Sequence, residues 1–187
     1  NEVDGRIPVL AGTGSNNTKE TIELTKQAEA VGVDGIMLVV PYYNKPSQQG
    51  LYEHFRQVAE NTSLPIMLYN IPGRTSVNMQ PEMIIRLSEI ENIVSVKEAS
   101  CDLDAVAEII EGTRDDFTVY SGDDGMTIPV MAIGGDGVVS VAAHVIGNEM
   151  KAMIESFENG DLAKAAKLHR QMLPVVEALF QAPSPAP

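Results

Sequence analysis

The chain has 187 residues, 44% of them hydrophobic and 21% charged, so we expect one globular domain with a buried core. Its formal net charge of -13 argues against nucleic acid and anionic membrane surfaces as partners, because like charges repel. The single cysteine, Cys101, excludes an internal disulfide, and no apolar run or signal-peptide pattern suggests a membrane segment, so a cytoplasmic protein is expected.

Short runs of apolar and β-branched residues, bounded by turn residues, predict six strands. Between them, apolar residues at helical spacing predict helices that open at capping residues such as Asn17, Ser47 and either Asp102 or Ser100. Pro174 should bend or interrupt the last helix, and the proline-rich residues 182–187 should form a connector. The strands are expected at 7–11, 34–40, 65–70, 93–97, 117–121 and 138–141. The helices are expected at 18–31, 48–59, 81–87, 103–111, 127–133, 148–158 and 162–180.

This alternation of strands and helices predicts a parallel sheet, since serial βαβ units connect parallel strands. The strand spacing is close to the about 31 residues per unit of a (β/α)8 TIM barrel. A six-stranded doubly wound sheet is the alternative. No glycine lies three residues after Gly12-Thr13-Gly14, so the dinucleotide fingerprint of that alternative is missing. We therefore expect about six consecutive units of a barrel.

Lys97 ends the fourth predicted strand, and period two places it on one face with Ile93 and Ser95. A lysine among apolar or small neighbours at a strand end is partly desolvated, which lowers its pKa. The neutral amine that results can form a Schiff base with a ketone. The alternative is an ordinary lysine whose ammonium extends into solvent, which is the commoner case for an isolated lysine.

Two further candidates follow the third predicted strand. Tyr69 shares a face with Met67, and its phenol can relay protons beside Lys97 if the third and fourth strands are neighbours. Arg74 follows a Pro-Gly turn and offers a planar guanidinium that suits a substrate carboxylate. The alternatives are a half-buried structural tyrosine and a surface ion pair.

The remaining polar and aromatic groups are less specific. Tyr42 and Tyr43 lie in a proline-bracketed loop and suit either a site or a subunit contact. The pair Asp123 and Asp124 has no third ligand at suitable spacing, so we expect a loop whose backbone lines a pocket. No metal site is expected, because the three histidines are far apart in the sequence: His54, His144 and His169.

Five segments of the chain resemble the dihydrodipicolinate synthase family of pyruvate-dependent class I aldolases, in order and at the family's spacing. The combination of YNxPxRT with VKEA is the most specific part of the resemblance. The segments are VPYYNKPSQQGLYEHF at 40–55, YNIPGRT at 69–75, VKEAS at 96–100, SGDD at 121–124 and GGDGVVSV at 134–141.

The resemblance implies a (β/α)8 barrel lyase that condenses pyruvate with L-aspartate 4-semialdehyde to 4-hydroxy-tetrahydrodipicolinate. This reaction belongs to diaminopimelate and lysine biosynthesis and needs no metal or organic cofactor. By the resemblance, Lys97 forms the imine with pyruvate and Tyr69 relays protons. Tyr43 completes the relay of a neighbouring subunit, and Arg74 holds the carboxylate of aspartate semialdehyde.

Further positions match by the same resemblance. The backbone of Gly122 and Val139 is expected to line the pyruvate site. Members regulated by lysine use positions that match Asn16, Glu20 and Tyr42, so these three residues are candidates for an allosteric lysine site.

The family has two more strand–helix units before this segment, with a threonine that takes part in the relay, and further helices after it. The chain is therefore expected to be a central part of a single catalytic barrel domain, residues 1–187, from a homo-oligomer that is a dimer of dimers in the family. N-acetylneuraminate lyase or another 2-keto-acid aldolase of the same superfamily is the first alternative. An inactive scaffold or binding module is the second, since a barrel lacking two strands has open edges.

Overall fold

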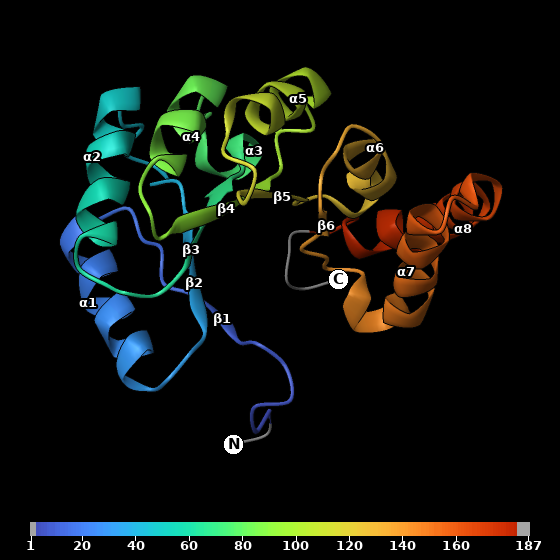
Figure 1. Ribbon diagram of the computed structural model, residues 1–187, viewed down its shortest axis with the longest axis horizontal. Helices are drawn as coiled ribbons and strands as arrows, with labels where there is room; N and C mark the ends of the chain where they lie inside the picture. The colour runs from blue at the N-terminus through green and yellow to red at the C-terminus, as the bar shows by residue number, and fades with distance from the viewer. Residues whose placement is uncertain (1–2, 183–187) are drawn as a thin grey trace. The chain divides into compact units, whose positions relative to one another are not determined.

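A computed structural model describes residues 3–182 of the chain (Figure 1). The chain divides into two compact units, Asn1–Val119 and Tyr120–Pro187. Its six strands are hydrogen-bonded in chain order, β1-β2-β3-β4-β5-β6. A doubly wound sheet reverses its strand order at a switch point, so this uninterrupted order excludes that alternative and is the order of a barrel. From residue 183 onward, the expected connector lies outside the described residues.

In the first unit, parallel strands alternate with helices as predicted. The ladders β1–β2, β2–β3 and β3–β4 are all parallel. The predicted caps are confirmed, because the side chains of Asn17, Ser47 and Asp102 each accept a hydrogen bond from a backbone N–H in the first turn. The elements are β1 (Leu10–Gly12), α1 (Thr18–Ala30), β2 (Gly35–Val39), α2 (Gln48–Ala59), β3 (Ile66–Asn70), α3 (Pro72–Thr75), α4 (Pro81–Ser88), β4 (Ile93–Glu98) and α5 (Leu103–Gly112).

The core of the first unit lies between these strands and the helices that cover them. Figure 1 shows α1, α2 and α4 along one side of the strands. The longer helices pack on one another in chain order, α1 on α2, α2 on α4 and α4 on α5. β2 and β3 are almost continuously apolar, as is typical of parallel strands covered on both faces. Residues with no exposed surface include Ile36, Leu38, Leu51, Phe55, Ile66, Leu68, Ile84, Leu87 and Ile93.

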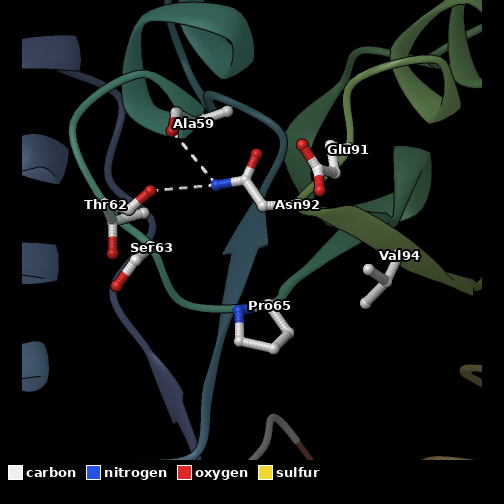
Figure 2. Close-up of a pocket in the computed structure, with 7 residues that line it drawn as sticks. All are labelled: Ala59, Thr62, Ser63, Pro65, Glu91, Asn92 and Val94. Carbon is white, nitrogen blue, oxygen red and sulfur yellow. Dashed lines mark hydrogen bonds between the residues drawn. The ribbon is translucent and has the colours of Figure 1, made fainter.

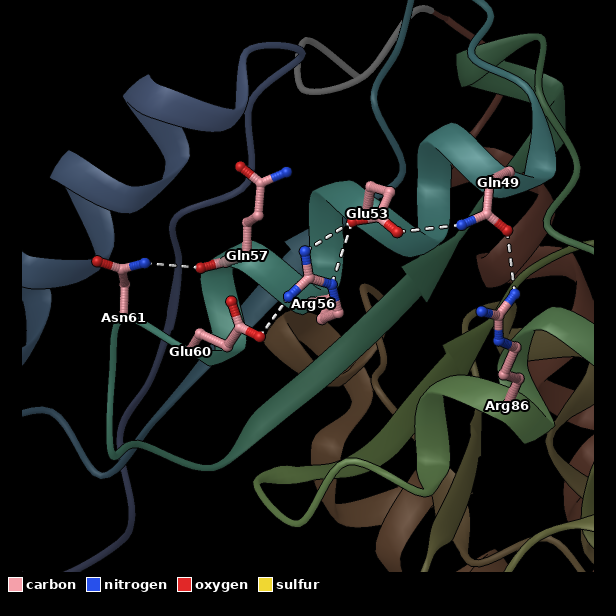
Figure 3. Close-up of polar contacts among 7 residues, drawn as sticks. All are labelled: Gln49, Glu53, Arg56, Gln57, Glu60, Asn61 and Arg86. Carbon is pink, nitrogen blue, oxygen red and sulfur yellow. Dashed lines mark hydrogen bonds and ion pairs between the residues drawn. The ribbon is translucent and has the colours of Figure 1, made fainter.

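The solvent side of α2 carries a polar network that reaches α4 (Figure 3). Arg56 donates to Glu53 Oε2 from Nε at 3.1 Å and from Nη2 at 2.7 Å, and it also pairs with Glu60. Gln49 donates to Glu53 Oε1 at 3.1 Å and accepts from Arg86 of α4 at 3.0 Å. Because these side chains are partly exposed, the network contributes little stability and serves to link the two helices.

The prediction of a buried first strand at 7–11 is wrong. β1 covers only Leu10–Gly12, and the side chains of Ile7 and Leu10 are 64% and 46% exposed. Among the described residues β1 pairs with β2 alone. An edge strand is covered from one side only, so an apolar run there does not have to be buried.

A β-bulge interrupts β4 near its start. Ile93 pairs with Ile66, but the next residue of β3, Met67, pairs with Ser95. Val94 is therefore an extra residue in β4. The strict alternation expected from Ile93 to Lys97 is therefore wrong before Ser95. Beyond the bulge the register is regular to the ends of both strands.

A short helix, α3, lies where the Pro-Gly turn was expected after β3. The backbone N–H of Arg74 donates to the carbonyl of Ile71 at 3.0 Å, and Pro72 opens the helix. Ser76 ends it with a φ of +60°, in the left-handed region. This turn of helix presents Arg74 directly after the strand that carries Tyr69.

In the second unit, the strand predicted at 138–141 is confirmed only at Val138, and the prediction is wrong for residues 139–141. The buried carboxylate of Asp124 accepts hydrogen bonds from the backbone N–H groups of Val141 and Ala142, both at 3.2 Å. These bonds remove the segment from the ladder, and only two residues remain as strand, paired in parallel with β5. The strand β5 (Thr118–Ser121) crosses from the first unit into the second, and the elements after it are η1 (Asp124–Met126), α6 (Thr127–Ala132), β6 (Gly137–Val138), α7 (Ala143–Glu158) and α8 (Leu162–Leu179).

The two long helices differ from their predictions at one point each. α7 begins five residues before the expected 148–158, with a kink at Ile146 (φ -122°, ψ 38°). Pro174 does not interrupt α8, which continues past it to Leu179 although proline cannot donate a backbone hydrogen bond. Over residues 3–182, neither these helices nor any other is long and apolar enough to cross a membrane. The packing of α7 and α8 is centred on Met150, Met153 and Met172.

Candidate active site

Lys97 and Tyr69 are direct partners in the parallel ladder between β4 and β3. The Nζ atom of Lys97 lies 4.1 Å from the centroid of the Tyr69 ring, and Lys97 is only 7% exposed. The predictions that the two strands are neighbours and that this lysine is partly desolvated are therefore confirmed. A lowered pKa of the Lys97 ammonium stays a prediction.

The charge of Arg74 acts on Tyr69. Burial raises the pKa of the Tyr69 phenol above its ordinary value, and the positive charge of Arg74 opposes this effect. The guanidinium is exposed at the end of α3 and pairs with no carboxylate among residues 3–182. The alternative of a surface ion pair for Arg74 is therefore not found within the described chain. Lys97, Tyr69 and Arg74 together place an amine, a phenol and a guanidinium at the carboxyl ends of two neighbouring strands.

Two residues that the sequence analysis did not select lie directly after this pair. Asn70 and Glu98 are also ladder partners, and they are 1% and 4% exposed. Asn70 Nδ2 donates to Glu98 Oε2 at 2.9 Å. Burial is the main cause of a raised pKa of the Glu98 carboxyl, while its hydrogen bonds act in the opposite direction. The sequence does contain a sign of this pair, since a polar residue directly follows each of the candidates Tyr69 and Lys97 at the end of a strand.

The loop after β2 carries the two adjacent tyrosines. Tyr43 is 88% exposed and has a φ of +71°, and Tyr42 is 42% exposed. Asn44 holds this loop to the loop after β1, because its Nδ2 donates to the carbonyl of Asn16 at 2.8 Å while Asn16 Nδ2 donates to Asn44 Oδ1 at 3.3 Å. Glu20 lies at the start of α1 and accepts from Ser15 Oγ at 2.6 Å. The structure thus joins Asn16 to the loop that carries Tyr42. A single lysine site formed by Asn16, Glu20 and Tyr42 would require this connection.

The second unit brings the segments of Gly122 and Val139 together. The backbone N–H of Val139 donates to the carbonyl of Ser121 at 2.9 Å, directly before Gly122. Asp124 lies in the same loop, where its carboxylate accepts from Ser140 Oγ and from two backbone N–H groups. The carboxylate of Asp124 is therefore engaged in holding the loops of this unit.

No group of three His, Cys, Asp or Glu side chains within residues 3–182 is arranged to hold a metal ion. The buried histidine, His54, bonds through Nδ1 to Thr18 Oγ1 at 2.9 Å. Its Nε2 atom is buried and has no hydrogen-bond partner among the described residues. Burial lowers the pKa of His54 to about 4, so the imidazole is neutral at physiological pH.

A pocket of about 510 Å³ lies at the opposite end of the same strands, where β3 and β4 begin (Figure 2). Asn92 spans it and donates from Nδ2 to the carbonyls of Ala59 and Thr62, at 3.1 and 3.0 Å. Ligands of parallel α/β sheets bind at the carboxyl ends of the strands, so we place the active site at the Lys97 end. The pocket is lined by Ala59, Thr62, Ser63, Pro65, Glu91, Asn92 and Val94.

The whole sequence, residues 1–187, matches the dihydrodipicolinate synthetase family. The chain belongs to this family. The 4-hydroxy-tetrahydrodipicolinate synthase of Bacillus velezensis, a member by its name, is 61% identical over 186 residues, which are 100% of this chain and 64% of that protein.

Solved structures of the dihydrodipicolinate synthetase family superpose closely on the chain. The enzyme from Bacillus anthracis gives a TM-score of 0.96 at 60% identity, over 98% of this chain and 63% of that one. The chloride-inhibited enzyme from Acinetobacter baumannii, solved in complex with pyruvate, gives a TM-score of 0.93 at 40% identity, over the same shares of the two chains. The chain therefore spans less than two thirds of the length of these relatives. The match confirms the predicted fold class, six consecutive strand–helix units of a TIM barrel.

Proposed function

We propose that the whole protein is a lyase that condenses pyruvate with L-aspartate 4-semialdehyde to 4-hydroxy-tetrahydrodipicolinate, in the diaminopimelate pathway to lysine. One observation carries the proposal: a nearly buried lysine amine, Lys97 Nζ, lies 4.1 Å from the ring centroid of a tyrosine on the adjacent strand. The names of the relatives and the pyruvate complex of one of them support the choice of substrates.

In the proposed mechanism, Lys97 Nζ attacks the carbonyl carbon of pyruvate and forms a C–N bond. Loss of water gives an imine, which withdraws electrons and makes the methyl group acidic. Loss of a methyl proton gives an enamine, which forms a C–C bond to the aldehyde carbon of aspartate semialdehyde. The amine of that substrate then attacks the imine carbon, closes the ring and releases Lys97 as the free amine. The imine accepts the electrons, so the mechanism uses no cofactor.

Tyr69 and Arg74 have complementary roles in this proposal. The pKa of the Tyr69 phenol is raised above its ordinary value, so the phenol is protonated at neutral pH and can donate to the oxygen that leaves as water. Arg74 pairs with no carboxylate of residues 3–182, which leaves its guanidinium to bind the carboxylate of aspartate semialdehyde.

The remaining assignments complete the proposal. The exposed ring of Tyr43 would enter the active site of a second subunit, in a homo-oligomer of the cytoplasm. The backbone of Gly122 and Val139 would line the pyruvate site. A regulatory lysine would bind between the loops joined by Asn16 and Asn44; the side chains of this site are Asn16, Glu20 and Tyr42.

Borohydride trapping tests the proposal. Treatment of the whole protein with pyruvate and sodium borohydride should add one reduced pyruvyl group, which peptide mapping should place on Lys97. Lys97→Arg keeps the charge but cannot form the adduct, whereas Lys151→Arg, at an exposed position on α7, is the matched control and should react normally. An adduct on another lysine would contradict the assignment of Lys97, and the absence of any adduct would favour the scaffold. Turnover of pyruvate with a sugar aldehyde in place of aspartate semialdehyde would favour the sugar-acid aldolases.

A further inference from the structure

A buried polar pair lies directly behind the proposed catalytic residues. Asn70 follows Tyr69, Glu98 follows Lys97, and the two are partners in the same ladder. Successive residues of a strand point to opposite faces, so the pair lies on the face opposite to Tyr69 and Lys97. Its 2.9 Å hydrogen bond therefore connects β3 and β4 next to the reacting groups, but on the opposite face of the sheet.

Asn70 also closes the loop that carries Arg74. Its Oδ1 accepts from the backbone N–H of Met79 at 3.0 Å, and its Nδ2 donates to Asn78 Oδ1 at 2.8 Å. The loop leaves β3 at Asn70 and returns to the same side chain at residues 78–79, with α3 between. Gln48 of α2 holds the returning end from the other side, because its Nε2 donates to the carbonyl of Asn78 at 2.8 Å.

Glu98 joins the pair to the loop after Lys97. Its Oε1 accepts from the backbone N–H of Ser100 at 2.7 Å, while its Oε2 accepts from Asn70. Both carboxylate oxygens thus receive N–H donors, and neither could be replaced by an NH₂ group without a clash of donors. The pair has a defined direction, with the amide as donor and the carboxylate as acceptor.

Packing alone does not require polar residues here. The positions two residues earlier on the same face, Leu68 and Val96, are fully buried and apolar, and they pack without hydrogen bonds between side chains. Burying a carboxylate and an amide costs free energy that apolar side chains would not cost. What a polar pair supplies is direction, because a hydrogen bond holds two groups at one distance and angle.

We propose that Asn70 and Glu98 are positioning residues, whose hydrogen bond sets Tyr69 against Lys97 and, through Asn78 and Met79, sets the loop that presents Arg74. This inference rests on the proposed function. It predicts that breaking the pair slows imine formation and weakens the use of aspartate semialdehyde together, although neither residue touches a substrate. Misplacement of reacting groups by about 1 Å lowers rates on the order of 100-fold.

Reversing the direction of the hydrogen bond tests the inference. In Asn70→Asp two carboxylates face each other. In Glu98→Gln the new NH₂ group faces another donor in either orientation of the amide, the Asn70 NH₂ group or the backbone N–H of Ser100. Each single variant should slow imine formation with pyruvate about 10- to 100-fold and raise the KM for aspartate semialdehyde. The double variant N70D/E98Q restores one donor and one acceptor between the two strands, and the Asn78 amide can turn so that its NH₂ group donates to the carboxylate at position 70; its rates should therefore return to within about threefold of the wild type.

Asn92→Asp is the matched control, since Asn92 donates two hydrogen bonds at the opposite end of the strands. It should lower Tm and leave kcat and both KM values unchanged. Unchanged kinetics in Asn70→Asp and Glu98→Gln, or a folded double variant as slow as the singles, would overturn the inference. If Asn70→Asp does not fold, Glu98→Gln alone tests the inference. Slowed imine formation in that variant would support the inference, and unchanged imine formation would overturn it. A wild-type protein that forms no adduct on Lys97 would instead refute the proposed function.

Discussion

Replacing His54 with asparagine should remove a pH dependence from the stability of the protein. The imidazole is 5% exposed, packs edge-to-face on Phe55, and bonds through Nδ1 to Thr18. Burial lowers its pKa to about 4 from an ordinary value of 6.5. An asparagine side chain can keep the bond to Thr18 but cannot take up a proton.

The sign and size of the effect follow from these two pKa values. Between pH 6.5 and about 4 the unfolded chain binds a proton at His54 that the folded chain does not bind, so acid favours unfolding. The contribution of the neutral His54 imidazole to the free energy of unfolding is fully present above pH 6.5, and it is lost as the pH falls to about 4. The full loss corresponds to about 3 kcal/mol of unfolding free energy, since each tenfold change in a proton equilibrium is about 1.4 kcal/mol.

Denaturant unfolding of wild type and His54→Asn, at fixed protein concentration and a series of pH values, measures this difference. The other titrating groups are common to both proteins and cancel in the subtraction. The wild type should lose about 3 kcal/mol more than the variant between pH 6.5 and 4. Parallel curves for wild type and His54→Asn would refute the burial of a neutral imidazole.

Three further substitutions test the site and the second unit. Tyr69→Phe should slow imine formation about 10²- to 10⁴-fold in stopped-flow with pyruvate, with Tm unchanged, because the ring stays and only the proton relay is lost; a normal rate would exclude a role for the phenol. Arg74→Ala should raise the KM for aspartate semialdehyde far more than that for pyruvate in steady-state kinetics, and an equal rise would weaken the substrate assignment. Asp124→Ala should lower the unfolding free energy by about 2 to 4 kcal/mol in urea titrations, since two backbone N–H groups lose their acceptor; a loss below about 0.5 kcal/mol would contradict the structural role of this carboxylate.

Local patterns in the sequence were enough to predict most elements of the fold. The capping side chains at Asn17, Ser47 and Asp102 mark helix starts because their hydrogen bonds span only three residues. The apolar runs of β2 and β3 mark buried strands for a similar reason, since most of their side chains are buried. The position of Lys97 at a strand end follows from the same local patterns.

Tertiary structure alone decided the features that depend on residues far apart in the chain. The pairing of Tyr69 with Lys97 is set by a ladder with a bulge, which no spacing in either strand reveals. The bond between Asn70 and Glu98 joins residues 28 apart, and the bonds from Asp124 to Val141 and Ala142, which end β6, span 17 and 18 residues. A polar side chain in a sequence shows that a partner is needed, but only the folded chain determines which partner comes within 3 Å.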